Sequence, residues 1–397
     1  MLKKKSSLFY REDLPIWQFP NGQKLTVPIF RFSGSSPKSP SAYIQANIHG
    51  SEVQGNAIIY CLLEHFIHNP PKGDVTLVPC ANPFASTQKS EEHSSGRHDS
   101  ITGQNWNRHY LDLIFESEEG HKFPEQIDLR KFVDSHIRLS WEKIKISFRK
   151  SLREALRAYR MRKNREGIGS SESIALSLQE MALEADCVID LHTSPLGARY
   201  AYAPEYAKRS ACFFQIPYLL LMPNRFDGAL DEATFCPWWK MYELFFSKGR
   251  LDIPLEVESY TLEYGNQGTL CLEKAFKEAQ GILSYLSYRK VVENLDFFQS
   301  GTCFSCKLED YLTLYSQNGG FVDYHADPGK EVEKGEHIAS VLDLHSIRNP
   351  EDIRSAVRKV RSPEKAIILL RYAFASVHSG TELFKVMTKL KKIEAQA

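Results

Sequence analysis

The sequence lacks a long uninterrupted hydrophobic run. Its longest apolar stretch, FFQIPYLLLMP from Phe213, is about half of the roughly 20 residues that a membrane-spanning helix needs, and it contains two prolines. The basic amino terminus, MLKKKSSLFYRE, leads into polar residues and not into the apolar core of a secretory signal. We therefore expect no contact with a membrane and a cytoplasmic location.

The sequence also lacks a charge surplus and a cysteine framework. Its 50 lysines and arginines nearly balance 49 aspartates and glutamates, which argues against a nucleic-acid-binding protein. The 8 cysteines are scattered, several of them in apolar runs, so we expect small buried hydrophobes in a reducing compartment and no disulfide framework. Cys303 and Cys306 form one CxxC pair. A structural zinc needs a second pair, so we expect a packing role or no special role.

What the sequence does contain is an alternation of strand and helix patterns, which indicates an α/β protein with a largely parallel sheet. We predict strands at 22–33, 41–48, 74–80, from Cys187 and from Pro254, and helices at 52–68, 138–165, from Ser170 and at 270–290. After about residue 296, short β runs between glycine-rich turns take over. We therefore predict a first domain over 1–295 and a small all-β domain over 296–397.

A basic insertion at about 112–165 ends in the predicted helix 138–165. Trp141, Ile144 and Phe148 begin an apolar repeat of three to four residues. The opposite face carries ten cations and few acids; the cations are Lys143, Lys145, Arg149, Lys150, Arg153, Arg157, Arg160, Arg162, Lys163 and Arg165. A solvated surface helix is the simpler interpretation. The alternative is a face that attracts acidic ligands or a partner.

Polar residues cluster where two predicted strands end. His49 and Glu52 lie in a Gly/Ser-rich turn, and Asp190 and His192 close the strand DCVIDLHTS. Each could be an ordinary solvated or core residue, but carboxyl ends of parallel strands meet at one sheet edge, where ligands bind. Hydrolytic zinc sites commonly take three His or carboxylate ligands, so His49, Glu52 and His192 are candidates. Asp190 faces the same way as His192 and can fix the tautomer of a ligand imidazole.

Three further positions suggest catalysis and substrate binding. Glu263, near the end of the strand from Pro254, is a candidate proton shuttle, with a solvated strand-end glutamate as the alternative. Arg97 and the pair Asn107–Arg108 lie in a long polar loop. A guanidinium binds a carboxylate through two hydrogen bonds, so these residues are candidates for holding an acidic substrate.

The same loop offers a second group of possible metal ligands, His93, His98 and Asp99. Loop histidines are usually solvated, so a second metal is the weaker interpretation.

Five motifs, in order and spacing, resemble the succinylglutamate desuccinylase/aspartoacylase family of the zinc carboxypeptidase clan over about residues 25–290. They are HGSEVQG, NP at 82–83, NWNRHY, VIDLHTS and TLEYGNQGTL. The resemblance implies a three-layer α/β/α domain with one zinc ion on His49, Glu52 and His192. It implies Glu263 as general base and acid, with Asn107 and Arg108 on the substrate. The implied reaction is hydrolysis of an N-acylated amino acid or a related small, acidic acyl-amine, and a homo-oligomer is left open.

The sequence departs from the family pattern at three places. Asn105 stands where the family usually has aspartate, Arg97 lies farther upstream of the Asn–Arg pair than the corresponding arginine, and the insertion at 112–165 is longer. These departures leave the predicted metal ligands intact and argue against an aspartoacylase or desuccinylase proper. A carboxypeptidase acting on peptide C-termini and a non-catalytic binding module are the alternatives.

The carboxy-terminal run PGKEVEKGEHIASVLD resembles a biotinyl/lipoyl hammerhead. The sequence around an attachment lysine is missing, so we expect no covalent cofactor. A cap over the active-site cleft or an oligomer contact is the expected role.

Overall fold

A mixed sheet of ten strands forms the centre of the computed structural model, which describes residues 9–88, 95–293 and 301–394. Its order is β1-β2-β4-β3-β7-β11-β9-β10-β12-β21. The strands are β1 (Phe9–Gln18), β2 (Lys24–Phe32), β3 (Ala42–Ala46), β4 (Val75–Val78), β7 (Cys187–Ser194), β9 (Tyr200–Pro204), β10 (Tyr218–Met222), β11 (Glu258–Asn266), β12 (Thr302–Lys307) and β21 (Lys391–Glu394).

The sheet is less uniformly parallel than predicted. Parallel pairs run through β4–β3–β7–β11 and again through β9–β10–β12. The joint between β11 and β9 is antiparallel, as are the pairs that include β1, β2 and β21. The four parallel strands β4, β3, β7 and β11 therefore bring their carboxyl ends to one edge, while the antiparallel strands extend the sheet on both sides.

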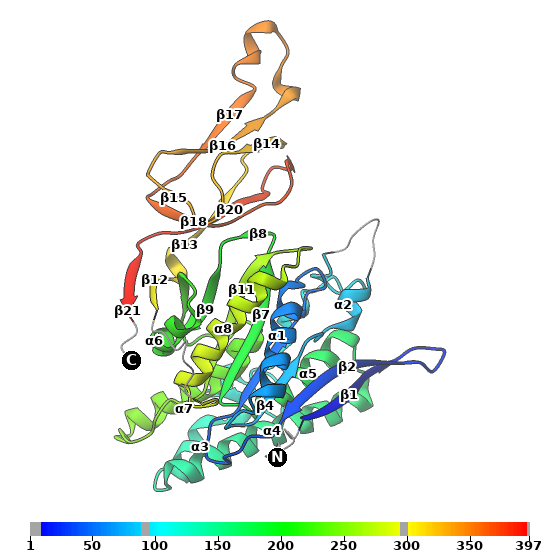
Figure 1. The fold of residues 1–397 in the computed structure, drawn as a ribbon, viewed down its shortest axis with the longest axis vertical. Coiled ribbons are helices and arrows are strands. Elements are labelled where there is room, and N and C mark those ends of the chain that lie inside the picture. The colour runs from blue at the N-terminus through cyan, green and yellow to red at the C-terminus, as the bar shows by residue number, and fades with distance from the viewer. Residues whose placement is uncertain (1–8, 89–94, 294–300, 395–397) are drawn as a thin grey trace, which may run out of the picture.

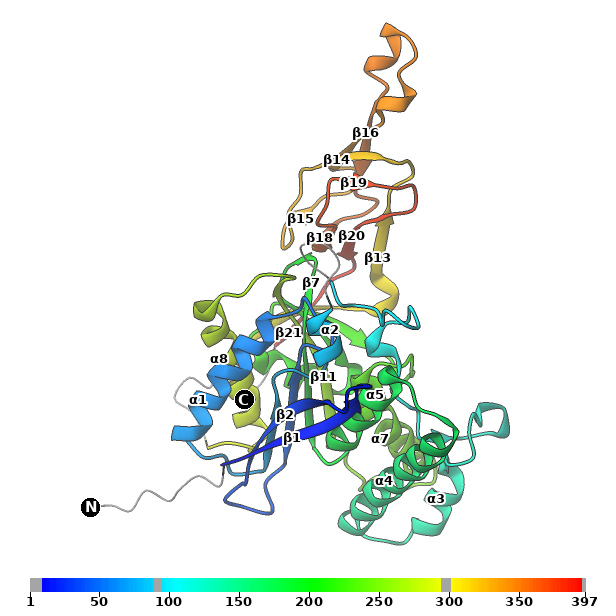
Figure 2. The same ribbon diagram turned by 90° about the vertical axis from the view of Figure 1, so that its right-hand side faces the viewer.

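Helices cover both faces of this sheet (Figures 1 and 2). Neighbouring strand residues point to opposite faces. Accordingly, Ile44 and Ile189 join the core beneath α1 and α8, whereas Tyr43 and Val188 join the core beneath α5 and α7. The helices are α1 (Gln54–His68), α2 (Pro83–Thr87), α3 (Leu129–His136), α4 (Trp141–Glu166), α5 (Ser170–Ala182), α6 (Lys208–Ala211), α7 (Leu230–Ser247) and α8 (Leu272–Tyr288).

The carboxy-terminal region forms two small sheets with their own apolar core beyond one end of the large sheet (Figure 1). Their strands are β13 (Tyr311–Tyr315), β14 (Gly320–Tyr324), β15 (Glu331–Val332), β16 (His337–Leu342), β17 (Val357–Arg361), β18 (Ala366–Arg371), β19 (Ser376–Val377) and β20 (Glu382–Met387). The short β8 (Leu196–Gly197) pairs with β18 and joins the two parts, while β5 (Ile114–Phe115) pairs with β6 (Ile127–Asp128) in the insertion. The predicted boundary between residues 295 and 296 lies outside the described residues.

The cations of α4 are mostly neutralised within the chain. Its apolar face, including Ile144, Phe148 and Leu152, is buried in a core shared with α7. Eight of the ten cations form ion pairs: Lys145 with Asp186 and Glu256, Arg149 with Asp186, Lys150 with Glu154, Arg153 with Glu184, Arg157 and Arg160 with Glu180, Arg162 with Glu125 and Glu166, and Lys163 with Glu172. Only two of these acids belong to α4 itself, so the sequence of the helix alone overstated its positive charge.

Two of the cysteines are not the free hydrophobic residues that we expected, although the chain has no disulfide framework in its described part. Cys212 and Cys303 form a disulfide that links the short 3-10 turn Cys212–Phe214 to β12. Cys306, the other member of the CxxC pair, is a free buried thiol.

Among the described residues, no helix combines the length and apolar character needed to cross a bilayer.

Candidate metal centre

The turn after β3 and the end of β7 bring the predicted metal ligands together. These strands pair in parallel with Ala46 opposite Leu191, so His49 and His192, which follow, emerge side by side. Gly55, in the first turn of α1, permits this approach. A Cβ on Gly55 would lie 2.8 Å from the Cβ of Ala46 and 2.9 Å from that of Leu191, which leaves room only for glycine.

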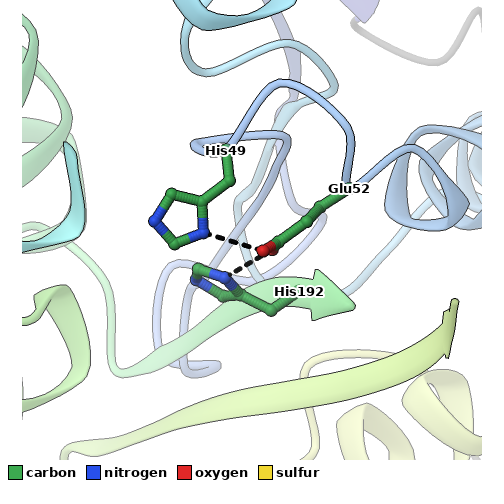
Figure 3. A group of neighbouring side chains, drawn as sticks. All are labelled: His49, Glu52 and His192. Carbon is green, nitrogen blue, oxygen red and sulfur yellow. Dashed lines mark hydrogen bonds and ion pairs between the residues drawn. The ribbon is translucent and has the colours of Figure 1, made fainter. Parts of the chain in front are cut away.

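The side chains of His49, Glu52 and His192 converge on one point (Figure 3). Nδ1 of His49 lies 2.9 Å from Oε1 of Glu52, and Nδ1 of His192 lies 2.8 Å from Oε2. The candidate ligand atoms all lie within 4.8 Å of one another, and all three residues are buried. This is the only cluster of its kind in the described ranges, and it could hold a metal ion.

A second group behind each imidazole sets its orientation. Nε2 of His49 lies 2.9 Å from Oδ1 of Asn105, an oxygen that also accepts the backbone N–H of Asn107. Nε2 of His192 lies 3.0 Å from Oδ2 of Asp190. The Asn105 oxygen only accepts hydrogen bonds, so it favours a proton on Nε2 of His49 and leaves the Nδ1 lone pair for a cation, the usual arrangement around ligand histidines. At His192, Asp190 lies at ion-pair distance and the hydrogen-bond contact of Nε2 is with the Asn107 amide.

The charges in this group are strongly coupled. Burial disfavours a charged Glu52, but the two histidines outweigh burial and hold the pKa of Glu52 well below its usual range. Burial also disfavours a protonated His192, yet Asp190 and Glu52 raise the pKa of His192 well above its usual value. The surroundings of Glu52 therefore favour a positive charge beside it, whether a proton on His192 or a bound cation.

A cavity of about 260 Å³ opens beside this group and is lined by His49, His192 and Glu263. Glu263 pairs with His192 in the register of β11 and β7. Burial raises the pKa of Glu263 to about 7, although His192 and Arg97 act in the opposite direction. A larger groove of about 520 Å³ elsewhere on the chain contains none of the predicted site residues.

The predicted substrate-binding residues line the same cavity. Asn107 and Arg108 belong to the 3-10 turn Trp106–Arg108, and the Asn107 amide lies 3.3 Å from Nε2 of His192. Arg97 Nη1 lies 3.5 Å from Oε1 of Glu52. The structure therefore brings Arg97 to the cavity despite its distance along the chain.

Sequence reasoning missed three residues at the site. Arg225 lines the cavity and follows β10, whose carboxyl end would have indicated it had that strand been predicted. Tyr311 lines the cavity from β13 of the carboxy-terminal region, which no local pattern could reveal. Gln267 donates a 3.3 Å hydrogen bond to Oε1 of Glu52 and lies within the motif TLEYGNQGTL, the available signal.

The second-metal hypothesis gains no support from the described residues. Asp99 is buried and accepts hydrogen bonds from the hydroxyl of Ser171 and the backbone N–H of Ile101. Neither Asp99 nor His98 joins a metal-binding cluster in the described part of the chain. His93 lies outside the described residues.

Comparison with known proteins supplies independent evidence. The model of the succinylglutamate desuccinylase/aspartoacylase catalytic domain matches residues 38–289. A family protein of this description from Shewanella amazonensis SB2B is 38% identical with a TM-score of 0.88, covering 97% of this chain and 100% of that one. One from Shewanella frigidimarina NCIMB 400 is 38% identical with a TM-score of 0.88, covering 98% and 99%. A succinylglutamate desuccinylase/aspartoacylase from Rhodobacter sphaeroides, 16% identical with a TM-score of 0.62 over 96% and 95%, shares the fold. No curated protein sequence matches the chain.

Proposed function

We propose a function from the premise that this chain belongs to the succinylglutamate desuccinylase/aspartoacylase family, a family of hydrolytic deacylases. The proposed activity is zinc-dependent hydrolysis of the amide bond of an N-acylated amino acid or a related small, acidic acyl-amine. The observation that carries the proposal is the convergence of His49, Glu52 and His192 beside a cavity whose lining includes His49, His192 and Glu263.

The residues present fit a zinc ion. Two imidazoles and one carboxylate are typical ligands of catalytic zinc; the Asn105 oxygen supports the required tautomer of His49, and Asp190 lies 3.0 Å from His192. Zinc bound here would lower the pKa of a water molecule to roughly 7 and would polarise the scissile carbonyl. In this proposal His49, Glu52 and His192 hold the ion, and Asp190 and Asn105 orient the two imidazoles.

Glu263 then serves as the proton shuttle. It lines the cavity beside His192, and a pKa of about 7 suits a group that must both accept and donate a proton near neutral pH. Its carboxylate takes one proton from the attacking water as the carbonyl carbon gains the new C–O bond. It returns that proton to the nitrogen as the C–N bond breaks, so that a carboxylic acid and a free amine leave.

The arginines account for an acidic substrate. Arg97, Arg108 and Arg225 all line the cavity, and within the described chain neither Arg108 nor Arg225 has a carboxylate at ion-pair distance. In the proposal Arg108 binds a substrate carboxylate and the Asn107 amide contacts its carbonyl, while Arg97 adds positive charge beside Glu52. A substrate carboxylate would form the ion pair that Arg108 and Arg225 lack in the described chain.

The size of the cavity favours a small acyl-amine over the alternatives. Its volume of about 260 Å³ lies just below the range of roughly 300–1,000 Å³ usual for ligand-binding pockets, which does not favour a peptide substrate. A non-catalytic binding module would have no use for a glutamate with a raised pKa facing the ligand cluster.

The test combines elemental analysis with a substrate panel. We expect one equivalent of zinc per chain, and release of a free carboxylic acid from acidic N-acyl amino acids faster than from neutral ones. Glu263→Gln should keep the metal and lose turnover about 100-fold or more, the usual scale for a general acid/base. Turnover of short peptides alone would assign a carboxypeptidase. Full metal content without turnover on any amide would favour the binding module.

A further inference from the structure

Glu263 is held by a chain of two buried hydroxyl groups. Ser194, the last residue of β7, donates a hydrogen bond from Oγ to Oε2 of Glu263 at 3.2 Å. The hydroxyl of Tyr200, the first residue of β9, lies 3.0 Å from Ser194 Oγ. β11 lies between these two strands in the sheet, so one side chain from each neighbouring strand takes part in the chain.

The chemistry of the groups gives this chain a single direction. An ionised carboxylate only accepts hydrogen bonds, so the hydroxyl of Ser194 must donate its one hydrogen bond to Glu263. Ser194 Oγ is then an acceptor toward Tyr200, whose hydroxyl must be the donor. Both residues are almost wholly buried, with 4% of Ser194 and 2% of Tyr200 exposed, so water does not compete for these groups. Burial also raises the pKa of Tyr200 well above its usual value, so its phenol stays protonated.

The two oxygens of Glu263 are therefore unequal. Oε2 receives the Ser194 hydroxyl, whereas no residue in the described chain donates a hydrogen bond to Oε1. A proton taken from water would displace the Ser194 donor if it went to Oε2, but it can go to Oε1 without breaking any protein contact. The geometry thus separates an anchoring oxygen from a reacting oxygen.

We propose that Ser194 and Tyr200 are positioning residues for the deacylation: they anchor Oε2 of Glu263 and reserve Oε1 for proton exchange with water and the leaving amine. This inference rests on the proposed function. Ser194 acts on Glu263 directly, and Tyr200 acts only through Ser194 by fixing the direction in which its hydroxyl points. Without the anchor the carboxylate can rotate, and small misplacements of a reacting group reduce rates by up to about 100-fold.

The experiment compares Ser194→Ala, Tyr200→Phe and the double variant on an N-acyl amino acid that the wild type hydrolyses. We expect Ser194→Ala to lower kcat about 10- to 100-fold, with KM and metal content little changed. Tyr200→Phe should lower kcat less, by about 3- to 10-fold, because a Ser194 hydroxyl remains. The double variant should be little slower than Ser194→Ala, because the hydrogen bonds of the described chain connect Tyr200 to Glu263 only through Ser194.

Two matched controls come from β11 itself. Ser259 and Tyr264 are buried on that strand, and neither hydroxyl has a hydrogen-bond partner among the described residues. Ser259→Ala and Tyr264→Phe should keep wild-type kcat, which shows that loss of a buried hydroxyl from this sheet is not in itself harmful.

Several outcomes would overturn the inference. One is a kcat for Ser194→Ala within twofold of wild type. A second is additive losses of kcat in the double variant. A third is a loss of kcat in the control variants equal to that in Ser194→Ala, or a loss of metal from Ser194→Ala; either result would indicate a merely structural role. A wild-type protein that hydrolyses no acyl-amide overturns the proposed function and this inference together. An active wild type with an unaffected Ser194→Ala overturns this inference alone.

Discussion

The helix α4 and the cavity beside His49 are both rich in charge, but the fold treats their charges in opposite ways. On α4, eight of ten cations find carboxylates, mostly from distant parts of the chain. In the cavity, neither Arg108 nor Arg225 has a carboxylate at ion-pair distance in the described chain, although Asp227, Asp231 and Glu232 also line it. The comparison teaches that the density of cations along the sequence does not locate a binding site, whereas cations that line a cavity without an ion-pair partner are candidates to bind an acidic ligand.

Removal of a candidate metal ligand should have the largest effect. His192→Ala should lose bound zinc and turnover together, because it removes a ligand and leaves Glu52 buried beside one imidazole. Elemental analysis and the acyl-amide assay check this. The matched change on α4, Arg157→Ala, should keep both. Full metal content with full turnover in His192→Ala would contradict the proposed site.

The next largest effect is a change in KM, which we compare between variants of two arginines. Arg108→Ala should raise KM for acidic substrates by about 10- to 100-fold, as expected for a lost charged hydrogen bond worth roughly 1.5–3 kcal/mol. Arg157→Ala should leave KM unchanged, because Arg157 already pairs with Glu180 at 2.7 Å on the surface. Steady-state kinetics on one acidic and one neutral N-acyl amino acid measure both. Equal KM changes for the two substrates would argue against carboxylate binding by Arg108.

A smaller effect concerns the group behind His49. Asn105→Ala should weaken metal binding by about 10-fold or more, the usual scale for loss of the acceptor behind a ligand histidine. Competition against a chelator of known affinity measures the change. A metal affinity equal to that of wild type would mean that Asn105 does not orient His49.

The fourth prediction concerns stability at α4 and leaves the cavity untouched. Burial disfavours a charged Asp186, but Arg149 and Lys145 outweigh it and hold the pKa of Asp186 well below its usual range. Because the folded-state pKa is the lower one, this pairing stabilises the fold above pH of about 4 and is lost as pH falls further. Asp186→Ala should lower the free energy of unfolding by about 3 kcal/mol at neutral pH and should keep kcat.

The pH dependence provides the check on that prediction. Denaturant titrations between pH of about 7 and 3 should show the difference between wild type and Asp186→Ala shrinking as pH falls. A difference that stays constant over this range would mean that the ion pairs of Asp186 do not stabilise the fold.

A helix or strand could be predicted from the sequence only where its own residues showed a clear hydrophobic periodicity. The predicted strands 22–33 and 41–48 correspond to β2 and β3, and the predicted helix 52–68 to α1. The helix α7 was missed because its residues are buried on most sides and Pro237 lies inside it, so no clean apolar stripe exists. The edge strand β1 was missed because it is charged, largely exposed and interrupted by Pro15.

The sequence by itself determined which candidate residues the site contains, because residue types that can bind a metal or transfer protons stand at the ends of recognisable strands. His49, Glu52, His192 and Glu263 were all named as candidates in this way. The tertiary structure alone decided which groups meet: the Asn105 oxygen behind His49, Arg225 in the cavity, and the carboxylates that neutralise α4. These contacts depend on the order and register of the strands. Pairing across a sheet brings together residues that are far apart in the sequence, and local sequence patterns do not indicate such contacts.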